Sequence, residues 1–309
     1  FIFLLGGLFL GWSLGANDAA NVFGTAVGTR MIRFKTAAIV CGVFVILGAI
    51  ISGAGTTATL GKLGSINAMP GAFAACVAAG LAVYLMTKSG LPVSTTQAIV
   101  GAIVGWNIYT GSSTNIQVLI TIILTWVLCP VIAGLIAMFF FILTKKLLQI
   151  TNMHLLRLDA YTRTALLLAG AFGAYSLGAN NIANVMGVFV PISPFTEINF
   201  MNILTLSSTG QLFLLGGIAI AIGVITYSKK VMLTVGSDLL KLSPVAAFIV
   251  VFSHSIVLFL FASQGISNLL HSFNLPSIPL VPVSSSQAIV GAVIGIGLLK
   301  GGKEVKWDI

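Results

Sequence analysis

Residues 13–24 read SLGANDAANVFG, and residues 176–187 repeat this stretch as SLGANNIANVMG. A second pair follows in the same order, with PVSTTQAIVGAIVG at 92–105 and PVSSSQAIVGAVIG at 282–295. Every mismatch within the second pair exchanges Thr for Ser or Ile for Val. Two such pairs in one order indicate an internal duplication of the chain.

The duplication predicts how the chain is divided. We expect a first repeat over residues 1–148, a basic connecting loop over 149–159 and a second repeat over 160–309. The first repeat ends with the long apolar block 117–144, for which the second has no counterpart. We therefore expect at least one terminal membrane helix to be missing from this chain. The second repeat also carries an insertion, Lys229–Leu242.

The composition indicates a membrane protein. Hydrophobic residues make up 58% of the 309 residues and charged residues only 7%, which is too few to cover a soluble domain. A helix needs roughly 20 apolar residues to cross a bilayer. Five apolar blocks approach that length: 36–57, 70–87, 117–144, 211–228 and 245–262. We predict an all-α integral membrane protein.

The net charge of +9 does not indicate nucleic-acid binding, because the basic residues stand in short groups between apolar blocks. Such groups orient membrane helices, with basic loops on the cytoplasmic side. The loop after the first motif holds Arg30, Arg33 and Lys35, whereas the matching loop, Pro191–Asn199, has no base and contains Glu197. Matching loops on opposite sides favour inverted repeats, the usual build of secondary transporters.

The two PVS segments are too short to span a membrane. Each has 14 residues, about 21 Å as a helix. Pro suits a helix start, and Ser and Thr cap free backbone N–H groups. We expect each repeat to contain a re-entrant half-helix hairpin, with the helix N-terminus inside the membrane as an anion site. Ordinary capping of two interfacial helices is the open alternative.

Asp18 is a carboxylate within an apolar stretch, where a charge costs about 2.5–3.5 kcal/mol or more. The membrane blocks contain no Lys or Arg to pair with it. Asn17 and Asn21 lie four residues apart, and so do Asn180 and Asn184, so that each pair shares one helix face. Carboxylate and amide oxygens suit a hard cation such as Na⁺. The alternative is that these Asn side chains only link neighbouring helices.

The paired motifs, together with KKVMLTVGSDLLKLSP at 229–244, resemble the inorganic phosphate transporter (PiT) family over almost the whole chain. The resemblance implies phosphate import driven by a Na⁺ or H⁺ gradient, usually by a dimer. Two departures bear on coupling: Asn181 stands where many relatives have Asp, and Gln97 and Gln287 stand where some have His. Both departures favour Na⁺ over H⁺, because they remove the obvious proton carriers.

The motifs and the resemblance together predict a site at the membrane midplane. Phosphate is expected to bind Asp18, Asn21, Ser94, Thr95, Thr96, Asn181, Asn184, Ser284, Ser285 and Ser286. Na⁺, the coupling ion, is expected to bind Asn17, Asp18, Asn21, Gln97, Asn180, Asn184 and Gln287. The histidines, His154, His254 and His271, form no ligand cluster in the sequence.

The predicted function is Na⁺-coupled phosphate import by alternating access, in a homodimer that crosses the cytoplasmic membrane several times. Phosphate and the lipid bilayer are the other expected partners, and nucleic acid is not one. The alternatives are an H⁺-coupled phosphate permease, a sulphate permease and a passive anion channel. An enzyme is not expected, because the sequence offers no nucleophile–base pair or metal cluster.

Overall fold

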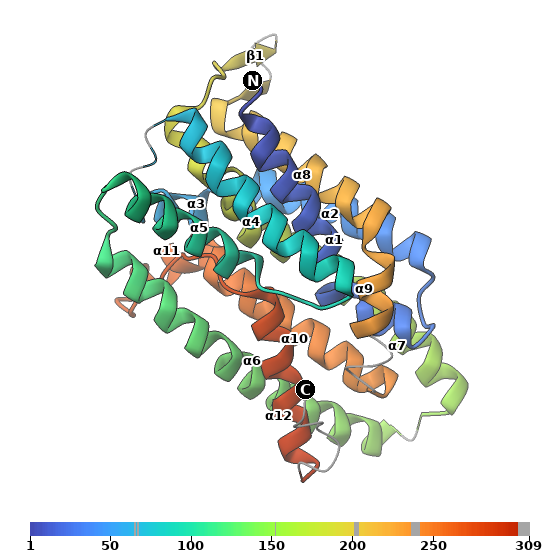
Figure 1. Ribbon diagram of the computed structural model, residues 1–309. Coiled ribbons are helices and arrows are strands. Elements are labelled where there is room, and N and C mark those ends of the chain that lie inside the picture. The colour runs from blue at the N-terminus through green and yellow to red at the C-terminus, as the bar shows by residue number, and fades with distance from the viewer. Residues whose placement is uncertain (65, 67, 152, 201–203, 236–241, 302–309) are drawn as a thin grey trace.

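The apolar blocks fold into helices that are joined mostly by short segments (Figure 1). The computed structural model describes the chain except residues 65, 67, 152, 201–203, 236–241 and 302–309. The helices are α1 (Leu4–Gly28), α2 (Phe34–Ser52), α3 (Ala54–Leu60), α4 (Met69–Ser89), α5 (Thr95–Thr110), α6 (Ile116–Thr151), α7 (Leu155–Met186), η1 (Gly187–Ile192), α8 (Ser208–Tyr227), α9 (Lys229–Leu233), α10 (Pro244–Ala262), α11 (Gln264–Ser272) and α12 (Ser285–Leu299). Two short strands, β1 (Ile198–Phe200) and β2 (Leu204–Leu206), pair antiparallel.

Five helices, α2, α4, α6, α8 and α10, are long and apolar enough to cross a membrane, and they coincide with the five predicted blocks. On α6 most large apolar side chains are exposed, among them Val127, Leu135 and Phe139. A soluble protein rarely exposes so continuous an apolar surface, whereas lipid covers it without cost. The structure therefore confirms the prediction of a multi-pass helical membrane protein.

The structure differs from the prediction in two places. The β1–β2 pair is a small exception to the expected all-α fold. The connecting loop predicted over 149–159 is mostly helical, because α6 continues to Thr151 and α7 begins at Leu155. Of the insertion at 229–242, the first residues form α9, and residues 236–241 lie outside the described part of the chain.

The parts of the chain before and after residue 152, called here the first and second halves, interlock. Helix α1 packs against α8 of the second half, and α7 packs against α2 of the first. Glycines from the repeated motif allow this. A Cβ on Gly15 would lie 2.0 Å from the carbonyl oxygen of Ile220, and one on Gly178 would lie 2.1 Å from that of Val45. Only glycine permits backbones to approach so closely.

The two short helices, α5 and α12, have different surroundings. Helix α12 packs tightly on α6: a Cβ on Gly291 would lie 2.1 Å from the Pro130 carbonyl oxygen. The equivalent residue of α5, Gly101, has no such neighbour within 4 Å among the described residues. One face of α5 is therefore exposed, and Thr95 and Thr96 at its start are buried.

Candidate binding site

Each short helix is preceded by an extended segment that an asparagine of a motif helix holds in place. Asn17 Oδ1, on α1, accepts a hydrogen bond from the Val93 N–H, and its Nδ2 donates to the Leu91 carbonyl, both at 3.0 Å. On α7, Asn180 Oδ1 accepts from the Val283 N–H at 3.0 Å. The first asparagine of each motif thus positions the chain that leads into α5 or α12.

Both short helices start directly after a capping serine. The hydroxyls of Ser94 and Ser284 each accept a hydrogen bond at 3.3 Å from the backbone N–H three residues further on. We expected proline at these helix starts, but Pro92 and Pro282 lie two residues before the caps, in the extended segments. Other N–H groups of each first turn have no partner within the helix, so both starts can receive an anion.

The two helix starts are bonded to each other. Thr96 Oγ1, on α5, donates to the Val283 carbonyl at 3.2 Å. Ser286 Oγ, on α12, donates to the Val93 carbonyl at 3.0 Å. Each start therefore holds the extended segment that precedes the other one, and residues far apart in sequence form one cluster.

The second asparagine of each motif reaches the short helix of the opposite half. Asn21 Nδ2 donates to Ser285 Oγ at 3.1 Å and to Ser286 Oγ at 3.2 Å. Asn184 Nδ2 donates to Thr96 Oγ1 at 2.9 Å and to Asn181 Oδ1 at 2.9 Å. The cluster is therefore shared by both copies of both motifs.

Asp18 lies in this cluster with 2% of its surface exposed. Its Oδ1 accepts a hydrogen bond of 3.4 Å from Thr95 Oγ1. Within the described ranges no basic side chain forms an ion pair with Asp18; the ion pair found there, Arg163–Asp159 at 3.9 Å, is exposed. A buried carboxylate without a basic partner calls for a cation or a proton.

Several buried polar atoms of the cluster have no hydrogen-bond partner among the described residues. Three are oxygen acceptors: Asn21 Oδ1, Asn184 Oδ1 and Gln287 Oε1. Two are amide donors: Asn180 Nδ2 and Asn181 Nδ2. Buried polar atoms are nearly always bonded, so such a group requires an explanation such as a bound ion. The acceptors fit a hard cation, and the donors fit an anion.

The structure brings most of the predicted residues together. The buried cluster comprises Asn17, Asp18, Asn21, Ser94, Thr95, Thr96, Asn180, Asn181, Asn184, Ser284 and Ser285, with Ser286 and Gln287 half-buried beside it. Gln97 lies next to the cluster in sequence, but its side chain is exposed on α5, so its place in the site stays a prediction. Ser94 and Ser284 act as caps, and both polar atoms of Asn17 are bonded to the chain.

Our sequence reasoning missed one residue of the cluster. His254, on α10, is fully buried, and its Nε2 lies 2.8 Å from Ser285 Oγ. The available signal was a histidine inside the apolar block 245–262, a position where an ionisable side chain is costly. Its hydroxyl partner could not be identified because it lies 31 residues away in the chain.

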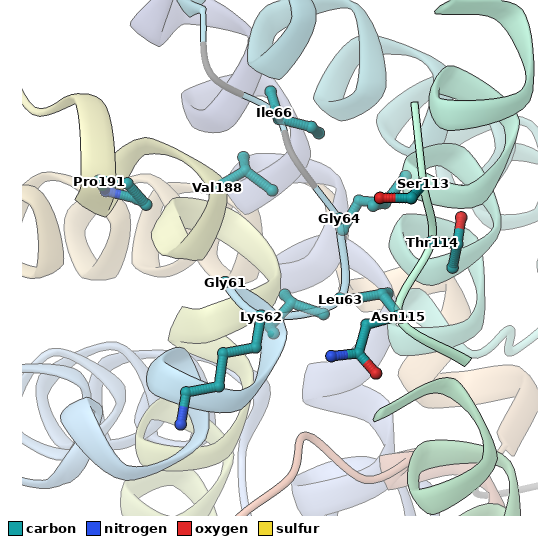
Figure 2. Close-up of a pocket in the computed structure, with 12 residues that line it drawn as sticks. Gly61, Lys62, Leu63, Gly64, Ile66, Ser113, Thr114, Asn115, Val188 and Pro191 are labelled. Carbon is teal, nitrogen blue, oxygen red and sulfur yellow. The ribbon is translucent and has the colours of Figure 1, made fainter. Parts of the chain in front are cut away.

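A cavity of about 570 Å³ opens at the other end of α5 (Figure 2). Val188 and Pro191 lie on one side of it and Ser113 and Thr114 on the other. Ile103, which also lines it, is eight residues after Thr95, or about 12 Å along the helix. The cavity is not lined by the polar cluster.

Together, these features define a class of protein: a multi-pass membrane protein whose buried polar cluster lies between the N-termini of two short helices, as in transporters with discontinuous helices. The sequence model of the Phosphate transporter family matches residues 14–309. The chain therefore belongs to the phosphate transporter family.

Related proteins agree with this assignment. A protein of Pyrococcus furiosus named "Putative phosphate permease" is 29% identical, with the match covering 100% of this chain and 89% of the relative. A protein of Haemophilus influenzae with the same name is 26% identical, over 96% of this chain and 86% of the relative. A solved structure titled "The sodium-dependent phosphate transporter" matches with a TM-score of 0.75 and 25% identity, covering 99% of this chain and 90% of the other.

Proposed function

We propose that this protein imports inorganic phosphate together with Na⁺ by alternating access, as a homodimer in the cytoplasmic membrane. The observation that carries the proposal is the position of Asp18, a buried carboxylate without a basic partner among the described residues, beside two helix N-termini. Such a site can bind an anion only if cations enter with it. The solved sodium-dependent phosphate transporter with the same fold supports this choice of ions.

The donors of the cluster support phosphate as the anion. In the proposal phosphate lies between the starts of α5 and α12, where the Ser285 hydroxyl and free backbone N–H groups can donate to its oxygens. The hydroxyls of Thr95, Thr96 and Ser286 lie in the same cluster, and each already donates to another protein atom. The unbonded amide nitrogen of Asn181 is a further donor. The re-entrant position of both helices in the membrane belongs to the same proposal.

The acceptors of the cluster support Na⁺ as the coupling ion. We assign Na⁺ to the Asp18 carboxylate with the amide oxygens of Asn21, Asn184 and Gln287, which lack donors among the described residues. The proposed set omits Asn17 and Gln97, since the first is bonded to the chain and the second is exposed. Phosphate entering alone would be a buried, unpaired charge, which costs several kcal/mol or more.

The distribution of basic residues supports inverted repeats. Lys229 Nζ lies 6.0 Å from the Phe34 ring centroid, and Lys230 Nζ donates to the Lys88 carbonyl at 2.7 Å, so bases from several loops gather at one end. Figure 1 shows β1, next to Glu197, at the end opposite α9. By the positive-inside rule the basic end is cytoplasmic. Helix α1 leads to this end, and α7 leads to the other.

The test is phosphate uptake by the purified protein in proteoliposomes, with Na⁺ and H⁺ gradients imposed separately. We expect uptake with an inward Na⁺ gradient, and no uptake with an H⁺ gradient alone. Asp18→Asn should abolish Na⁺-dependent uptake, because the substitution removes the charge that holds the cation.

Asp159→Asn is the matched control, since Asp159 is exposed and far from the cluster, and it should transport normally. Full Na⁺-dependent uptake by Asp18→Asn would overturn the proposed coupling. Uptake that needs no gradient at all would indicate a passive channel. Complete inhibition by equimolar sulphate would move the assignment to a sulphate permease.

A further inference from the structure

His254 is a buried ionisable side chain that has no role in the transport cycle proposed above. It lies on α10 with no exposed surface, and its Nε2 is 2.8 Å from Ser285 Oγ. Ser285 is the first residue of α12, in the turn that we assign to phosphate. Starting from the proposed function, we propose that His254 is a positioning residue that turns the Ser285 hydroxyl proton toward the bound anion.

The argument starts from what a serine hydroxyl can do. Its oxygen accepts two hydrogen bonds and donates one. Asn21 Nδ2 donates to Ser285 Oγ at 3.1 Å and so occupies one acceptor position. If the Nε2–H of His254 donates to the second acceptor position of Ser285 Oγ, both acceptor positions are occupied. The hydroxyl proton is then available only to a third partner, and a phosphate oxygen fits that place.

The opposite arrangement, with Ser285 donating to Nε2, is less favourable. A neutral imidazole carries its proton on one nitrogen, so Nδ1 would then be the N–H donor. The Nδ1 of His254 is buried and has no hydrogen-bond partner among the described residues. For backbone groups, buried N–H donors without an acceptor are rarer than carbonyl acceptors without a donor, and we apply the same preference to the imidazole. The surroundings of Nδ1 therefore favour the proton on Nε2.

The first hydroxyl of each short helix has a different neighbour in the two halves of the site. In the first half, Thr95 Oγ1 is directed by a carboxylate, because it donates to Asp18 Oδ1 at 3.4 Å. In the second half, Asn181 replaces that aspartate in the motif, and the serine has His254 as its neighbour instead. One hydroxyl thus points toward the proposed cation ligand, and the other is left for the anion.

Kinetics of phosphate uptake test this role. His254→Leu and Ser285→Ala should each raise the KM for phosphate about tenfold, since a hydrogen bond to a charged group is worth that much or more. Because His254 acts through Ser285, the double variant should be no worse than Ser285→Ala alone. His254→Gln, which keeps an N–H donor, should recover most of the affinity. His271→Leu, at an exposed histidine, is the matched control and should transport normally.

A multiplied effect in the double variant, about a hundredfold, would overturn the proposal, because His254 would then act independently of Ser285. A second measurement does not depend on transport. In a His154→Gln/His271→Gln background, His254 is the remaining histidine, and ¹⁵N NMR of the labelled protein reports which ring nitrogen is protonated. Protonated Nε2 supports the proposal, and protonation of Nδ1 alone overturns it. If the wild-type protein takes up no phosphate, the proposed function fails, and the NMR result still decides the role of His254.

Discussion

The two asparagines of each repeated motif have different structural roles. Asn17 and Asn180 hold the extended segments before the short helices, whereas Asn21 and Asn184 reach the short helix of the opposite half. The first pair therefore supports the fold around the site. The second pair, with unbonded oxygens, is available to a ligand.

This division predicts opposite effects of two alanine substitutions. Asn17→Ala should lower the free energy of unfolding by about 1–3 kcal/mol, because the Val93 N–H loses its acceptor. Asn21→Ala should change stability less and uptake more, since its Nδ2 donates to side-chain hydroxyls and not to the backbone, and its Oδ1 has no bonded partner in the described fold. Thermal unfolding in detergent and uptake in proteoliposomes measure the two effects. Equal stability of the Asn17→Ala variant and the wild type would contradict the structural role.

The sequence predicted the cluster through its repeated spacing, but spacing alone could not choose between neighbouring side chains. Thr96 is buried and Gln97 exposed, although both follow the same cap. Helix α5 is apolar on all sides, so no polar face in the sequence shows which side turns inward. His254 was missed for a related reason, because its contact with Ser285 depends on tertiary packing.

Among the elements, the closest packing joins helices of different halves. Gly15 on α1 faces the backbone of α8, and Gly178 on α7 faces that of α2. Both glycines belong to the GAN sequence that also carries the polar cluster. The motif thus combines close helix packing with the placement of Asp18 and the asparagines.

Alanine at either of these glycines should destabilise the protein. The added Cβ would meet a carbonyl oxygen at 2.0 Å for Gly15→Ala and at 2.1 Å for Gly178→Ala, so a helix must shift. Overpacking of this kind costs about 1–3 kcal/mol or more. Gly101→Ala is the control, because a Cβ there would have no atom of another described element within 4 Å. Thermal unfolding of the three variants tests this; a Gly15→Ala variant as stable as the control would contradict it.

Element positions were more predictable than element ends. The five spanning helices follow from hydropathy, because lipid selects long apolar segments. The end of α6 at Thr151 and the start of α7 at Leu155 were not predicted. Charged residues such as Lys145 and Arg157 suggested a loop, but a helix can continue past the apolar region and carry such residues. The β1–β2 pair is too short to leave a clear pattern in the sequence.

At the scale of the whole molecule, the interlocked packing predicts that neither half folds into active transporter without the other. A chain divided at residue 152 should give active transporter only when residues 1–151 and 153–309 are expressed together. Each part alone would expose the glycine faces of α1, α2, α7 or α8 that the other part covers. Co-purification from detergent and phosphate uptake test this. Uptake by one part alone would contradict it, and the uncut chain is the control.

The same interlocking bears on how the gene arose. In a half-length ancestor, the Gly15 face of the first helix would have been uncovered. Two copies of that ancestor could have covered this face on each other by reciprocal packing. Fusion of two such genes would have allowed the copies to diverge in sequence. Asp18 opposite Asn181, with His254 beside Ser285, is a difference that identical subunits could not have maintained. In the proposed function, this difference would let one side of the site hold the cation and the other side hold the anion.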